Sequence, residues 1–201
     1  MAILEKKVGS LTVAVEYDQY PMNPRKEWDN LGVIYSNHKH ESPDGLSVFD
    51  CPTNEGGNLN ADKLDKVGVW LPLAYYDHRV FRVFVGQPYT DSYRGWDSGN
   101  FGVILATSEA IRRTFGCKRI TKSIREKAVE VLKAEVDCLD RYYNGGVYGF
   151  TVTDERGECI YSCYGFYCDP EDVLSEGVLE AEYLMEEREA ELEEVAQLGM
   201  A

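Results

Sequence analysis

The chain has 201 residues, of which 44% are apolar, and a formal net charge of −14. This length and this apolar content are enough for one domain with a buried core, and they exclude a wholly disordered chain. No run of eighteen apolar residues occurs, and Lys6 and Lys7 interrupt the segment in which a signal peptide would be apolar. We therefore expect no membrane span and a location in the cytoplasm.

The charge is distributed unevenly along the chain. Twelve acidic residues and one arginine lie between Asp169 and Glu194, so this segment carries −11 and the rest of the chain only −3. At a helical rise of about 1.5 Å per residue these carboxylates recur about every 3.3 Å, whereas duplex DNA carries one charge per roughly 1.7 Å. Residues 112–127, in contrast, hold seven basic side chains and one glutamate. The pattern predicts an acidic C-terminal helix and a basic central segment.

The first half of the chain is dominated by strand patterns. Residues 11–17 (LTVAVEY) alternate between apolar and other side chains, which predicts a half-buried strand. Residues 66–86 are rich in β-branched and aromatic side chains, and we expect Pro72 to divide them into a short edge-like piece and a strand over residues 79–85. A further strand is predicted over residues 101–106.

Two helices follow. Ser108 begins a short one, and a longer helix begins near Thr121 or Ser123, where SIRE matches a capping box with Ser123 as the cap. Asn144, Gly145 and Gly146 end it. Its apolar residues recur at spacings of four and three and predict one buried stripe: Ile124, Ala128, Leu132, Val136, Leu139 and Tyr143.

The last third predicts a hairpin and a helix. With DERG (154–157) as the turn, Val152 pairs with Cys159, Phe150 with Tyr161 and Tyr148 with Cys163, all on one apolar face. Asp169 caps the next helix and Pro170 opens it. The resulting fold class is α+β, with a mainly antiparallel sheet, two packed helices and an acidic C-terminal helix. We expect one α+β domain over residues 1–168, and a helix or tail over 169–201 that packs on it or extends from it.

A Trp-Asp step before a Gly-Val-Ile run occurs twice, in EWDNLGVIY (27–35) and GWDSGNFGVIL (95–105). The likeness ends after Ile34 and Ile104, which argues against a duplicated domain. We expect Asp29 and Asp97 to accept hydrogen bonds from backbone amides just ahead of them, and Trp28 and Trp96 to pack across the turns. A ligand site at these four residues remains an alternative, because loops at strand ends often carry binding groups.

No motif in the sequence indicates catalysis or metal binding. His38 and His40 have no Cys or acidic partner at ligand spacing, and Asp77 and His78 are strand neighbours that should point to opposite faces. The spacing of the cysteines matches no zinc or redox motif, and we expect reduced thiols: Cys51, Cys117, Cys138, Cys159, Cys163 and Cys168. We predict a protein that is not an enzyme and needs no metal or cofactor; a hydrolase around Asp77, His78 and Asp97 is the least favoured alternative.

Three segments together carry a family resemblance: LPLAYYDH (71–78), GWDSGNFGVILATSEAIRRTFGCKRITKSIREK (95–127) and VYGFTVTDERGECIYSCYGFYCDPEDVL (147–174). They resemble a family of small phage and mobile-element proteins with a Tyr-Asp-His strand, a Trp-Asp-Ser-Gly turn and a Ser-Cys-aromatic-Gly-Phe-Tyr ending. Tyr164 stands where that ending has Trp. The resemblance spans about residues 71–174 and implies an accessory protein made in a bacterial host; it carries over no catalytic residues.

By analogy with acidic proteins of such origin, we expect an inhibitor of a host restriction or CRISPR system that binds a host protein complex and mimics nucleic acid. The residues predicted to bind this partner are glutamates of the C-terminal helix: Glu180, Glu182, Glu186, Glu187, Glu189, Glu191, Glu193 and Glu194. The alternative is direct binding of nucleic acid by the basic segment, through Arg112, Arg113, Lys118 and Arg119.

Overall fold

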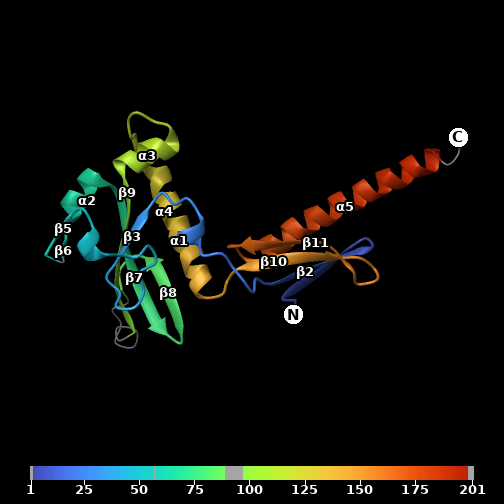
Figure 1. Cartoon of the computed structure of the whole chain (residues 1–201), viewed down its shortest axis with the longest axis horizontal. Helices are drawn as coiled ribbons and strands as arrows, with labels where there is room; N and C mark the ends of the chain where they lie inside the picture. The colour runs from blue at the N-terminus through green and yellow to red at the C-terminus, as the bar shows by residue number, and fades with distance from the viewer. Residues whose placement is uncertain (1, 57, 89–96, 199–201) are drawn as a thin grey trace. The chain divides into compact units, whose positions relative to one another are not determined.

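The computed structural model describes residues 2–56, 58–88 and 97–198, and within these ranges all side chains except those of residues 55, 58 and 191–198. The chain forms two compact units (Figure 1). Unit 1 contains residues 1–22 and 145–201, and unit 2 contains residues 23–144. The fold class is α+β with mostly antiparallel sheets, as the sequence predicts.

Unit 1 is a four-stranded sheet covered by one helix. The strand order is β1 (Leu4–Val8), β2 (Leu11–Tyr17), β10 (Tyr148–Thr153) and β11 (Cys159–Phe166), with every neighbouring pair antiparallel. The alternation in β2 is confirmed, because Leu11, Val13 and Val15 are buried. These residues form one core with Phe150 and Val152 of β10.

Helix α5 (Pro170–Leu198) packs its first half on this sheet (Figure 1). Val173 and Ala181 are fully buried in the core of unit 1. A Cβ at Gly177 would lie 2.6 Å from a methyl group of Val13, so glycine lets the helix approach the sheet closely. The first half of the acidic helix therefore belongs to the core of unit 1.

The hairpin register differs from the prediction by two residues. Phe150 lies opposite Cys163 and Val152 opposite Tyr161, with irregularities on either side of this stretch. After one of these, Cys159 pairs with Thr153 and is exposed, so its predicted place in the core is wrong. A shift of two residues preserves the face of each side chain, which is why the apolar side of the hairpin was otherwise predicted correctly.

Unit 2 is a five-stranded sheet with helices around it. The strand order is β4 (Leu46–Ser47), β3 (Val33–Ser36), β9 (Ser98–Thr107), β7 (Gly68–His78) and β8 (Val80–Val85). Only β3 and β4 pair in parallel among these neighbours. The remaining elements are α1 (Pro24–Glu27), the 3₁₀ helix η1 (Val48–Asp50), β5 (Asn54–Glu55), β6 (Asn58–Leu59), α2 (Ala61–Val67), α3 (Ser108–Phe115) and α4 (Lys122–Tyr143).

Strand β7 runs through Pro72, so the expected division at this proline is wrong. The Pro72 carbonyl accepts a hydrogen bond from the Gly86 amide at 2.9 Å, one residue beyond the last paired residue of β8. The carbonyl and the nitrogen of one strand residue point to the same neighbour. The missing N–H of Pro72 therefore faces the end of the β7–β8 ladder, where it removes only a terminal hydrogen bond.

Helix α4 contributes the buried stripe that its sequence predicts. Ala128, Leu132, Val136 and Leu139 pack in the core of unit 2, and Ile124 and Tyr143 contact its margin. The N-cap is Thr121, whose hydroxyl accepts from the Ile124 amide at 3.3 Å, and not Ser123.

The structure divides the chain into two units, whereas the sequence predicts a single domain over residues 1–168. Strand β2 pairs with β10, so the first 22 residues join the C-terminal segment in one sheet. Such pairing between distant segments leaves no local signal in the sequence.

Candidate functional site

The first Trp-Asp turn is organised by Arg25 and Asn30 and not by Asp29. The side-chain amide of Asn30 donates to the backbone carbonyls of Pro24 and Trp28 at 2.9 and 2.8 Å. Asp29 is exposed, and no described residue donates a hydrogen bond to its carboxylate. The prediction that Asp29 fixes the turn is therefore wrong, and the side-chain amide of Asn30 has that role.

Arg25 is the centre of a buried polar cluster. Its side chain is 2% exposed, and all five of its N–H groups donate. Two go to the carboxylate of Asp44 at 2.8 and 2.6 Å, and the others go to Asn30, to Glu135 of α4 and to the carbonyl of Gly32. Burial alone would lower the pKa of Arg25, but the hydrogen bonds and charges of Asp44 and Glu135 outweigh it and raise that pKa.

The carboxylates of this cluster also bind backbone amides. Glu135 accepts from the Leu31 amide at 2.6 Å, and Asp44 accepts from the Ile34 amide at 2.6 Å. The cluster thus ties α1, the start of β3 and α4 together. Because every donor of Arg25 is already used, the arrangement is suited to hold the fold and leaves no donor for a ligand.

The second Trp-Asp turn includes Trp96, which lies outside the described residues. The Asp97 carboxylate lies 3.0 Å from Nδ1 of His78, and its backbone carbonyl accepts from the Asp77 amide at 2.6 Å. As expected, Asp77 is not the partner of His78; the partner is Asp97, which directly precedes β9. Both side chains are substantially exposed, at 54% for His78 and 34% for Asp97. An Asp–His pair can orient an imidazole for proton transfer, but catalysis also needs a substrate site beside it.

Most acidic side chains of α5 are exposed along the part of the helix whose side chains the structure describes. Glu182, Glu186, Glu187 and Glu189 are exposed, and Glu180 is half-buried near Tyr161, where its charge raises the pKa of that tyrosine. The side chains of Glu191, Glu193 and Glu194 lie outside the described ones. The apolar residues of the same stretch face the core of unit 1: Leu174, Val178, Ala181 and Met185.

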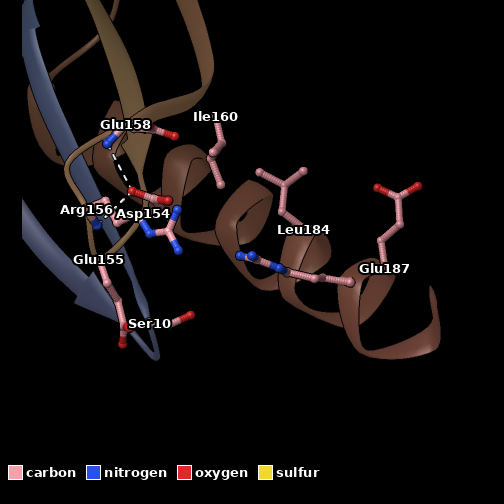
Figure 2. A pocket seen from close by; sticks show the side chains of 9 residues that line it. Ser10, Asp154, Glu155, Arg156, Glu158, Ile160, Leu184 and Glu187 are labelled. Atoms are coloured by element: carbon pink, nitrogen blue, oxygen red, sulfur yellow. Dashed lines mark hydrogen bonds between the residues drawn. The ribbon is translucent and has the colours of Figure 1, made fainter. Parts of the chain in front are cut away.

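A hollow of about 620 Å³ borders this helix (Figure 2). Leu184 and Glu187 of α5 form one side, and the β10–β11 turn forms the other. In the turn, the Asp154 carboxylate accepts from the amides of Arg156 and Glu158 at 2.8 and 2.9 Å. The hydrogen bond from Glu158, followed by that from Arg156 and by the charges of Arg156 and Arg188, lowers the pKa of Asp154. The hollow mixes both signs of charge and so favours no single class of ligand.

The basic segment is a solvent-exposed surface of unit 2. Arg112 and Arg113 end α3, Lys118 and Arg119 lie in the following loop, and all four are exposed. Arg125 of α4 donates to the carbonyl of Gly68 at 3.2 Å. The four exposed basic residues lie close together in the sequence. Between the two pairs, Gly116 in the left-handed conformation ends helix α3.

The cysteines are all free thiols, as expected. Within the described ranges, no group of three or more His, Cys, Asp or Glu side chains is arranged to hold a metal ion. The lack of a metal requirement stays a prediction, as does the lack of catalysis. No helix among the described residues is long and apolar enough to cross a membrane.

Sequence reasoning missed a second pocket, of about 500 Å³, at one end of the sheet in unit 1. Four tyrosines from two distant segments line it: Tyr17, Tyr20, Tyr164 and Tyr167. The sequence shows each pair of tyrosines, but only the pairing of β2 with β10 and of β10 with β11 brings the pairs together.

Comparison of the chain with known protein families, with curated proteins and with solved structures gives no match.

Proposed function

We propose that the protein is a non-enzymatic phage or mobile-element accessory protein that inhibits a host restriction or CRISPR-type system in the bacterial cytoplasm. It binds a nucleic-acid-handling host protein with its acidic helix. The supporting observation is the arrangement of α5: apolar residues fix its first half on the sheet, while Glu182, Glu186 and Glu187 stay exposed. A row of exposed carboxylates on a folded base resembles a strand of phosphates and complements a basic channel.

The proposal is tested in host cells that carry a defined restriction or CRISPR system. Expression of the protein should raise the plating efficiency of a phage that the system restricts. A variant with Glu186, Glu187 and Glu189 changed to Gln should lose most of this effect. Full protection by the variant, or no protection by the wild type against any such system, would contradict the proposal.

The alternative is direct binding of nucleic acid by the basic segment. The exposure of Arg112, Arg113, Lys118 and Arg119 favours it. In that case purified protein should bind duplex or single-stranded oligonucleotides with an affinity that falls steeply with salt, and changing the four residues to Gln should abolish binding. The overall charge of −14 opposes this function.

A further inference from the structure

The tyrosine pocket of unit 1 has an aromatic and apolar lining that is open to solvent. Tyr20 is 92% exposed, Tyr17 49% and Tyr164 44%, and Met22 beside them is 56% exposed. Large apolar side chains are rarely this exposed together, and such patches commonly mark binding sites. Its volume of about 500 Å³ is within the range of small-ligand sites.

Two of the four tyrosine rings, those of Tyr164 and Tyr167, are held in position before any ligand binds. Tyr164 lies over Gly149 of the neighbouring strand, where a Cβ would come within 2.1 Å of its ring. Its hydroxyl donates to the Glu16 carboxylate across the sheet, and this hydrogen bond raises the pKa of Tyr164 to about 12. Tyr167 donates in the same way to the backbone carbonyl of Met22. Rings fixed by hydrogen bonds lose little conformational entropy on binding.

The charge of the pocket selects the ligand. Glu16 and Asp18 line it, and the described lining residues include no lysine or arginine. Asp18 is half-buried, and one of its carboxylate oxygens accepts from the Tyr20 amide at 2.9 Å. The faces of aromatic rings are also electronegative. Carboxylates and tyrosine faces together therefore favour an organic cation.

We propose that this pocket binds an arginine side chain of a partner protein. A guanidinium group is planar, stacks on aromatic rings and binds a carboxylate through two parallel hydrogen bonds. A lysine ammonium is compact and strongly hydrated, so it gains less from an open aromatic surface. The pocket uses residues other than the acidic helix, and the inference goes beyond the proposed function without depending on it.

The test is a titration of the intact protein with the peptide N-acetyl-Gly-Arg-Gly-amide, followed by two-dimensional NMR. Saturable shifts should appear at the pocket with a dissociation constant in the millimolar range, since a single side chain contributes few contacts. The same peptide with citrulline, which keeps the shape and loses the charge, should bind at least about five-fold more weakly. The lysine peptide should also be weaker.

Two substitutions separate the pocket from the rest of the surface. Tyr20→Ala removes an almost fully exposed ring, and Asp18→Asn keeps the acceptor for the Tyr20 amide while removing the charge. Each should weaken the arginine peptide at least about three-fold. Tyr183→Ala, at a tyrosine 59% exposed on α5, is the matched control and should leave binding unchanged.

Equal binding of the arginine and citrulline peptides, or unchanged binding by Tyr20→Ala, would overturn the inference. If the peptide causes no shifts at the pocket but dilution of the protein does, the occupant is a second copy of the chain. If a short oligonucleotide causes them instead, the occupant is a nucleic-acid base. The variant with Glu186, Glu187 and Glu189 changed to Gln should titrate like the wild type. This result keeps a failure of the pocket distinct from a failure of the proposed function.

Discussion

Ile34 of β3 lies directly opposite Ile104 of β9, and neither side chain has any exposed surface. The two Gly-Val-Ile runs thus form neighbouring antiparallel strands, with Val33 opposite Leu105 and Tyr35 opposite Val103. Both isoleucines pack in one core with α4. The repeated motif supplies two neighbouring segments of one sheet, the start of β3 and the second half of β9.

The isoleucine pair should respond to the loss of single methyl groups. Ile34→Val and Ile104→Val should each lower the free energy of unfolding by about 0.5–1.5 kcal/mol. Because the side chains are close, the double variant should deviate from the sum of the two. Ile160→Val, at an isoleucine 45% exposed in unit 1, is the control and should change stability by less than about 0.5 kcal/mol. Urea unfolding measures all four variants, and equal effects at Ile34 and Ile160 would contradict the packing.

Arg25 should be essential to the stability of unit 2. Arg25→Ala leaves the largely buried carboxylates of Asp44 and Glu135 without a counterion, which should cost about 3–5 kcal/mol. Arg25→Lys keeps the charge but cannot supply five donors in a plane, so we expect an intermediate loss. Both are measured by denaturant unfolding; a loss below about 1 kcal/mol in Arg25→Ala would show that the cluster is dispensable.

The two aspartates of the Trp-Asp steps should contribute little to stability. Asp29→Ala should change the free energy of unfolding by less than about 0.5 kcal/mol, since no described group bonds to its carboxylate. Asp97→Ala breaks an exposed pair with His78 and should cost no more than about 1 kcal/mol. A double-mutant cycle with His78→Ala isolates that pair. A loss of about 2 kcal/mol at Asp29 would restore its predicted role in the turn.

Much of the fold could be predicted because local patterns dominate particular elements. The alternation in β2 and the stripe on α4 identify strand and helix without tertiary information. The predicted division of the strand at Pro72 is wrong. The hydrogen bond that a strand loses at a proline depends on which neighbouring strand the nitrogen faces, and the sequence of one strand does not show its neighbours. The joining of both chain ends in one sheet was missed for the same reason.

The candidate sites were less accessible from sequence. The Arg25 cluster joins residues up to 110 positions apart, and no local pattern links Arg25 to Glu135. The partner of His78 is 19 residues away, beyond strand β8. The tyrosine pocket depends on Gly149, whose missing side chain makes room for Tyr164, and a glycine in a strand does not reveal which ring covers it.

His38 should make stability depend on pH below neutrality. Its Nδ1 accepts from the Glu41 amide at 3.1 Å, and its ring packs against Tyr75 and Phe81. Burial lowers the pKa of His38 below 6.5, although the charges of Glu41 and Asp77 partly oppose this; His40 adds to the lowering. The unfolded chain then binds the proton more readily than the folded chain. The contribution of neutral His38 to the free energy of unfolding is therefore present above pH 6.5 and is lost as the pH falls through the lower pKa of the folded state.

His38→Asn removes this titration while retaining an oxygen that can accept from the Glu41 amide. The variant should show a smaller decline in unfolding free energy than the wild type as the pH falls below 6.5, measured by urea unfolding at several pH values. Identical slopes for both proteins would exclude His38 as the source.

The acidic helix should bind its partner through exposed charge. The attraction weakens with salt, because the screening length falls from about 10 Å at 0.1 M to about 3 Å at 1 M. Changing Glu186, Glu187 and Glu189 to Gln should leave unfolding unchanged, since all three are exposed, and should reduce affinity mainly by slowing association. The control changes Glu5, Glu27 and Asp62, also exposed, to their amides and alters the net charge equally. Stopped-flow association with the protein of the restriction or CRISPR system that the plating assay identifies measures both variants. Equal slowing by both would assign the effect to overall charge, and no slowing by either would leave the helix a solubilising surface.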